Sequence, residues 1–99
     1  MFEIEQGEGG RIMFSGRLDA AQCAKAQAFL DAAADPREFD FAALEYISSA
    51  GLGVLLKTQK RLMASNAKLR LTGLSRHLRD IFQYSGFDRI FEIDPPEPE

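Results

Sequence analysis

The stretch Ile47–Gly53 places two serines and two glycines between an apolar run and a helical pattern. A serine there could act as a nucleophile, but it would need a general base, and the chain has one histidine, His77. The stretch also lacks the flanking glycines of a strand-to-helix nucleophile elbow. We therefore predict no catalytic residue and no enzymatic activity.

Phosphate cradles and metal sites need other patterns. Gly51 and Gly53 form only a fragment of the dinucleotide fingerprint, and the chain has no Gly-x-x-x-x-Gly-Lys-Ser/Thr loop. The carboxylates of Asp19, Asp40 and Glu45 have no metal-ligand spacing, and one cysteine makes neither an internal disulfide nor a cysteine-built zinc site. We expect neither a cofactor nor a metal.

Two roles remain open for the serines. A serine just before a helix can accept hydrogen bonds from free backbone amides and so cap the helix. A serine at a helix start can also carry a phosphate, which adds roughly −1.5 to −2 charges and would disrupt a docked partner. Gly51 and Gly53 each cost a helix about 1 kcal/mol relative to alanine, so a close backbone approach or a partner surface should offset them.

Composition limits the other classes of function. The net charge of −3 argues against nucleic acid as a partner, and 45% hydrophobic residues suit a globular domain with a core of Phe, Leu and Ile. The acidic start of the chain does not resemble a signal peptide, and no apolar run is long enough to insert directly into a membrane. These features favour a cytoplasmic protein.

The apolar periodicity predicts an α/β fold with a mixed sheet and the order β-β-α-β-α-β-α-β. We expect one domain over residues 1–94 and a flexible Pro/Glu tail over 95–99. In order, the predicted elements are strands over 2–5 and 11–15, a helix from an Asp19 cap to about residue 34, a strand over 38–47, a helix through Met63 closed by residues 65–67, a strand over 68–72, a helix between Ser75 and Gly86, and a strand over 87–93.

The helices also predict which residues lie inside and outside. Their apolar faces assign six side chains to the core: Leu55, Leu56, Leu62, Leu78, Ile81 and Phe82. Lys57, Lys60 and Arg61 should form the solvated side of the helix that ends at Met63.

Three segments together resemble the STAS domain, a family named for sulfate transporters and anti-sigma factor antagonists. They are Gly16–Ala20 (GRLDA), Leu44–Leu56 (LEYISSAGLGVLL) and Leu78–Ile93 (LRDIFQYSGFDRIFEI), in the family's order and spacing. The resemblance implies a sheet of four or five strands with three helices. It also implies a bacterial partner-switching regulator of the anti-sigma factor antagonist type.

In such regulators, an anti-sigma factor that is also a serine kinase phosphorylates the first turn of a helix, and a phosphatase removes the phosphate. The resemblance places the acceptor at Ser49, with Ser48 where many members have aspartate, and puts Asp19 and Asp40 near the acceptor. The contact residues that we expect follow the acceptor directly: Ala50, Gly51, Leu52, Gly53 and Val54.

Two alternatives remain open from the sequence. STAS proteins also serve as phosphorylation-independent interaction subunits of transporter or signalling complexes, and Ser48 in place of aspartate favours that reading slightly. Family members often have a further helix after the last strand, and here a partner or a second copy of the chain could cover that part of the sheet.

Overall fold

The computed structural model describes residues 1–33, 35–64 and 68–94, which form one mixed five-stranded sheet with the order β1-β2-β3-β4-β5. β1 is antiparallel to β2, whereas β2, β3, β4 and β5 run parallel to one another. The predicted α/β fold is therefore confirmed, with five strands. Their bounds are β1 Phe2–Gln6, β2 Arg11–Leu18, β3 Glu38–Ile47, β4 Arg70–Thr72 and β5 Glu92–Ile93.

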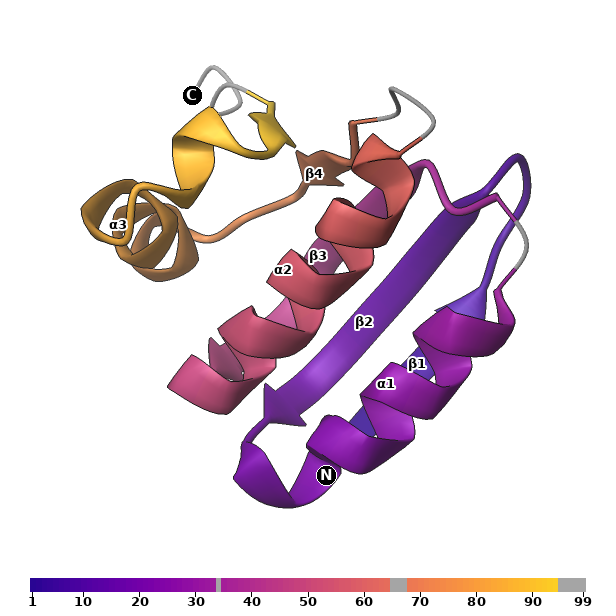
Figure 1. Cartoon of the computed structure of the whole chain (residues 1–99). Helices are drawn as coiled ribbons and strands as arrows, with labels where there is room; N and C mark the ends of the chain where they lie inside the picture. Colours follow the sequence, from indigo (N-terminus) through magenta and orange to yellow (C-terminus); the bar gives the residue numbers. More distant parts are fainter. Residues whose placement is uncertain (34, 65–67, 95–99) are drawn as a thin grey trace.

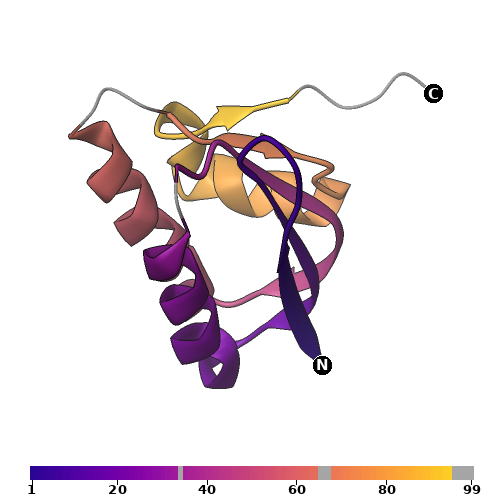
Figure 2. The same ribbon diagram turned by 90° about the vertical axis from the view of Figure 1, so that its right-hand side faces the viewer.

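Helices connect the parallel strands. Figures 1 and 2 show α1 and α2 side by side against the sheet, with α3 beyond the end of β4. Over the described ranges, no helix combines the length and the apolar character that crossing a bilayer requires. The helical elements are α1 Cys23–Ala32, α2 Ser49–Met63 and α3 Arg76–Tyr84, with 3₁₀ turns η1 at Ala20–Gln22 and η2 at Phe87–Arg89.

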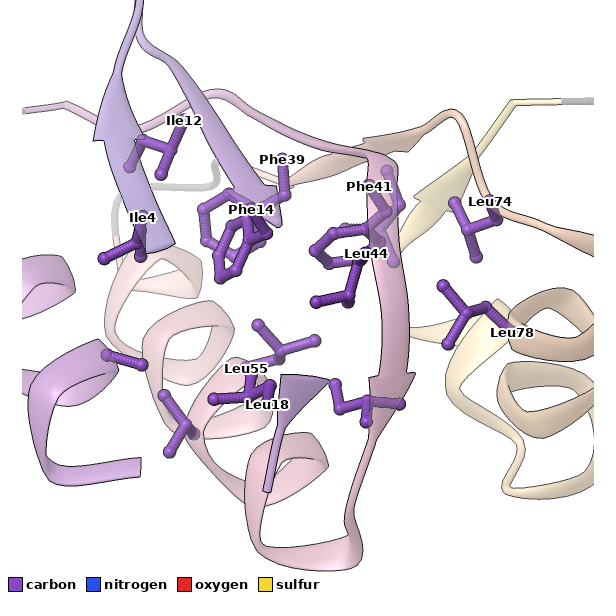
Figure 3. Close-up of a cluster of buried hydrophobic side chains, with 14 of the residues drawn as sticks. Ile4, Ile12, Phe14, Leu18, Phe39, Phe41, Leu44, Leu55, Leu74 and Leu78 are labelled. Carbon is purple, nitrogen blue, oxygen red and sulfur yellow. The ribbon is translucent and has the colours of Figure 1, made fainter. Parts of the chain in front are cut away.

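The core lies between the sheet and the helices and is rich in phenylalanine, as composition predicts (Figure 3). The Phe41 ring on β3 contacts Phe14 of β2 at 4.9 Å between centroids and Phe82 of α3 at 6.2 Å. Through these contacts α3 packs against the face of the sheet that carries the buried side chains of β2 and β3. The core assignments are confirmed as fully buried for Leu55, Leu78 and Phe82, whereas Leu56, Leu62 and Ile81 are half-buried.

The other face of the sheet carries polar side chains. Arg11 on β2 pairs with Asp40 and Glu38 on β3, and Thr72 on β4 donates a hydrogen bond of 2.9 Å to Glu38. The hydrogen bond to Asp40 and the charge of that carboxylate raise the pKa of Arg11 above its ordinary value. A ladder of charged and hydroxyl groups therefore crosses three strands on the face opposite the core.

The start of the first helix differs from the prediction. Asp19 has extended backbone angles, but its side chain accepts no capping hydrogen bond. Instead its carbonyl accepts from the Gln22 amide at 3.1 Å and from the Cys23 thiol at 3.3 Å. The chain closes this tight 3₁₀ turn before α1 begins, so the predicted Asp19 cap is wrong.

The last predicted strand, over residues 87–93, is also mostly wrong. Gly86 takes left-handed angles, with φ of 78°, and the chain then turns through η2. The Phe91 amide donates to the Phe87 carbonyl at 3.0 Å, and their rings lie 6.0 Å apart. This four-residue spacing of aromatic residues is that of a helical turn, and only Glu92–Ile93 pairs with β4.

Several predicted boundaries fall on residues 34, 65–67 and 95–99, outside the described residues. The end of the first predicted helix near residue 34, the closing turn over 65–67 and the flexible tail therefore stay predictions.

Candidate functional site

The site begins where β3 passes into α2. Ser48 is the N-cap of α2, with φ −86° and ψ 170°, and its hydroxyl oxygen accepts a hydrogen bond of 3.1 Å from the Gly51 amide. Its carbonyl accepts from the Leu52 amide at 2.9 Å. The capping role that either serine could have filled belongs to Ser48.

Ser49 is the first residue of α2 and is exposed. Its hydroxyl makes no hydrogen bond with any residue in the parts of the chain that the structure describes. The first turn of α2 contains no acidic residue. An exposed, unengaged hydroxyl therefore sits at the positive end of a 15-residue helix dipole.

The two glycines of the first turns have different surroundings. Gly51 is buried, and a Cβ atom there would lie 2.8 Å from Ile47 Cγ1, 3.0 Å from Leu18 Cγ and 3.1 Å from the Leu18 carbonyl oxygen. A Cβ on Gly53 would meet nothing within 4 Å. The predicted close backbone approach is thus found at Gly51, whereas Gly53 opens the surface of the helix.

Asp19 lies beside this helix start, as the resemblance implies. The Ser48 amide donates to the carbonyl of Leu18, the residue before Asp19, at 2.9 Å. Asp19 Oδ1 is buried and has no hydrogen-bond partner among the described residues. A buried acceptor without a donor costs about 1–3 kcal/mol, so this oxygen can accept a bond that the described chain does not provide.

Asp40 does not belong to the site. It is the third residue of β3, on the polar face, where it pairs with Arg11. At about 3.3 Å per strand residue, the end of β3 at Ile47 lies roughly 23 Å farther along the sheet. The prediction that Asp40 lies near the acceptor is therefore wrong, because residues at opposite ends of one strand cannot meet.

The five expected contact residues divide by exposure. Ala50 and Gly53 are exposed and Leu52 is half-buried, so these three remain accessible. Gly51 and Val54 are buried against the sheet, which corrects their assignment as surface contacts. The helical period explains the correction, since residues three apart share a face, and this face points inward.

One further pair near the site was not predicted from the sequence. The Arg17 guanidinium lies 4.3 Å from the centroid of the Tyr46 ring. Arg17 and Tyr46 are register partners, one residue before Leu18 and Ile47, which are buried. Only the strand register, which the sequence does not state, brings these two side chains together.

His77 and the acidic residues of the described ranges lie apart from the two serines or from one another. His77 is exposed on α3, a different element from the two serines. Among the described residues, no group of three or more His, Cys, Asp or Glu side chains is arranged to hold a metal ion.

Comparisons with known proteins agree with this architecture. The family described as "Mlab, STAS domain" matches residues 1–93. A protein of Bordetella bronchiseptica named as a candidate anti-sigma factor antagonist, BtrV, is 38% identical over 82 residues, which cover 79% of this chain and 71% of that protein.

Solved structures share the fold. An anti-sigma factor antagonist from Mycobacterium paratuberculosis superposes with a TM-score of 0.78 and 22% identity, covering 97% of this chain and 86% of the other. The phosphorylated form of the Bacillus cell fate determinant SpoIIAA gives a TM-score of 0.67 and 22% identity, covering 96% and 92%. With the family match over nearly the whole length, these likenesses lead to one conclusion: the chain belongs to the STAS domain family.

Proposed function

We propose that this protein is a non-enzymatic anti-sigma factor antagonist that is switched by phosphorylation of Ser49. The unphosphorylated chain binds an anti-sigma factor that is also a serine kinase, and a sigma factor is thereby released. A phosphatase restores the binding form. The observation that carries the proposal is the exposed hydroxyl of Ser49 at the first residue of α2, beside a helix cap that does not use it.

The relatives support the regulatory role. BtrV is named as a candidate anti-sigma factor antagonist, the Mycobacterium protein is named as an anti-sigma factor antagonist, and one SpoIIAA structure is of a phosphorylated form. The chemistry of this chain is compatible with that form, because a phosphate at a helix N-terminus interacts favourably with the free amides and the helix dipole. Phosphorylation of Ser49 should therefore leave α2 folded and change only its surface.

The binding surface that we infer contains the accessible residues of the helix start, namely Ser49, Ala50, Leu52 and Gly53. Asp19 lies beside this surface, and its buried Oδ1 lacks a hydrogen-bond donor within the described residues. A phosphate on the nearby helix start would repel a bound partner by charge and by bulk.

The experiment is incubation of the purified chain with the anti-sigma factor kinase of its own organism and ATP, followed by mass spectrometry. We expect one phosphate on Ser49 and none in a Ser49→Ala variant. The matched control is Ser48→Ala, which loses the capping bond and about 1 kcal/mol of stability but keeps the acceptor. We also expect Ser49→Glu to weaken binding to the kinase.

Two results would contradict the switch. One is the absence of phosphate on Ser49, and the other is unchanged binding of the Ser49→Glu variant. Phosphate found on Ser48 would show that the proposed acceptor, Ser49, is the wrong serine. The reactive hydroxyl would then be the one that caps the helix.

A second candidate function is a phosphorylation-independent interaction subunit of a transporter or signalling complex. Ser48 favours it, because the position before the acceptor has a neutral cap where many family members have aspartate. In that case a pull-down recovers a stable complex that Ser49→Glu does not weaken. A transporter operon beside the gene would agree with this function, and a serine kinase or phosphatase gene would agree with the first.

A further inference from the structure

Beyond its first turn, α2 presents an exposed basic stripe. Ser49, Gly53, Lys57 and Lys60 follow one another at intervals of four, four and three residues, and all four are exposed. At about 100° per residue they fall within a sector of roughly 80°. The acceptor serine and the two lysines therefore share one face of the same helix, which we name the α2 stripe.

The lysines of the α2 stripe are not engaged in ion pairs within the part of the chain that the structure describes. Neither ammonium group forms an ion pair with any residue of the ranges 1–33, 35–64 and 68–94. The sequence of α2 includes no acidic residue, although the chain as a whole has a net charge of −3. Like charges three residues apart on a helix repel slightly, so an anion placed between Lys57 and Lys60 would be attracted to both.

The third basic residue of α2 has a different role. The Arg61 guanidinium donates to the carbonyls of Leu30 and Asp31 at the end of α1, at 2.9 and 3.3 Å. Arg61 is exposed too, but its guanidinium is engaged with the end of α1, which leaves Lys57 and Lys60 as the cations of the stripe. Gly53 keeps the space between them and Ser49 open.

We propose that the α2 stripe is a docking surface for an acidic patch on the protein partner, with Lys57 and Lys60 as the residues that determine binding strength. The inference rests on the proposed function, since the partner docks on the helix start that carries the switch. Two lysines on an acidic chain are too few for strong attraction to nucleic acid or to an anionic membrane, which need larger basic clusters. A protein surface with a few carboxylates fits this charge.

The stripe also explains how a phosphate would act on such a partner. Ser49 lies about 12 Å along the helix axis from Lys57, at 1.5 Å per residue. This backbone separation exceeds the screening length of about 8 Å at physiological salt, so the lysines offset only part of the phosphate charge, although their side chains lean toward the helix start. The phosphate instead faces the partner's own carboxylates, and repulsion replaces part of the attraction on one continuous surface.

The test measures binding of the anti-sigma factor kinase to the double variant Lys57→Glu/Lys60→Glu as a function of salt. We expect binding to weaken about tenfold at low salt, mainly through slower association, and the difference to shrink in 0.5 M salt. The neutral variant Lys57→Gln/Lys60→Gln should give a smaller loss in the same direction. The matched control is Arg76→Glu/Arg89→Glu, which changes the net charge equally on α3 and η2 and should bind like the unsubstituted chain.

Each outcome has a defined meaning. Equal binding by the lysine variants and the unsubstituted chain overturns the α2 stripe and leaves the proposed function standing. Equal weakening by the Arg76/Arg89 control also overturns it, since net charge alone would then explain the loss. No binding by the unsubstituted chain contradicts the proposed function and the stripe together. Lysine-dependent sedimentation with phosphatidylserine–phosphatidylcholine vesicles would assign the lysines to lipid instead.

Discussion

At the scale of single residues, two glycines separated by one position in α2 do different things. Gly51 lets the helix approach β2 and β3 closely, whereas Gly53 has no neighbour within 4 Å of its missing side chain. Both cost helix stability in the same way, because each widens the backbone freedom of the unfolded chain. Only Gly51 gains a packing contact in return.

Alanine substitutions should therefore change stability in opposite directions. Gly51→Ala places a methyl group 2.8 Å from Ile47 Cγ1, and we expect it to lower the free energy of unfolding by about 1–3 kcal/mol. Gly53→Ala enters open space, and we expect a gain of up to about 1 kcal/mol from helix propensity. Urea denaturation of both variants measures the difference. Equal midpoints would mean that α2 shifts freely on the sheet.

At the scale of elements, α1 and α2 are tied by one side chain. Arg61 near the end of α2 donates two hydrogen bonds to the last carbonyls of α1 and lies 3.8 Å from the Asp31 carboxylate. Cations and donors at a helix C-terminus satisfy carbonyls that the helix itself leaves free. Arg61 therefore adds a polar link between two helices that also pack through the core.

Removing this link should destabilise the fold modestly. For Arg61→Ala we expect a loss of about 1 kcal/mol, because the side chain is partly exposed and its charge is screened by solvent. The neighbouring Lys60→Ala substitution removes a cation without such bonds and should stay within about 0.5 kcal/mol. Chemical denaturation of both variants checks the expectation, which fails if Arg61→Ala and Lys60→Ala have the same midpoint.

The elements also show what sequence could predict. The alternation around Phe39 and the helical period through Leu55 identified β3 and α2, because burial imposes those periods on the chain. The strand predicted over 87–93 is mostly wrong, because a short apolar run fits a 3₁₀ turn as well as a strand. Contacts between elements, such as Arg61 with α1 and Arg17 with Tyr46, depend on register and helix placement, which periodicity does not specify.

For the candidate site too, one part could be predicted from the sequence and another part could not. Its location at the β3–α2 junction could be predicted from the serines and glycines before a helical pattern, and the neighbourhood of Asp19 from the resemblance to the STAS family. The separate roles of Ser48 and Ser49 could not, since either serine can cap a helix by type alone. The distant place of Asp40 follows from the ten-residue length of β3, which carries it to the far end of the sheet from the helix start.

At the scale of the whole molecule, the strands of the sheet differ greatly in length. β2 and β3 share seven register pairs in its centre, whereas β4 has three residues and β5 has two. Strands with few ladder bonds and partly exposed neighbours open at lower free energy than central strands. The fold should therefore be most resistant to opening around β2 and β3 and least resistant beyond β4.

Native-state hydrogen exchange tests this gradient. We expect the slowest amides at buried positions such as Ile12 and Phe39, with exchange set by global unfolding, and much faster exchange at Glu92 and Ile93. Uniform protection across all five strands would contradict it and would mean that the sheet opens only as one cooperative unit.

The neutral cap Ser48 affects how phosphorylation would change the charge at the start of α2. An aspartate at position 48 would be ionised at neutral pH, because its ordinary pKa is about 3.9. Phosphorylation would then take the helix start from one anion to a larger one, roughly −1 to −3. With Ser48 as cap and no acidic residue in the first turn, the same modification takes the turn itself from no charge to about −2, with Asp19 beside it in both states. A partner that senses charge in this turn would meet either no anion or one strong anion. With aspartate at position 48 it would meet either a weaker or a stronger anion.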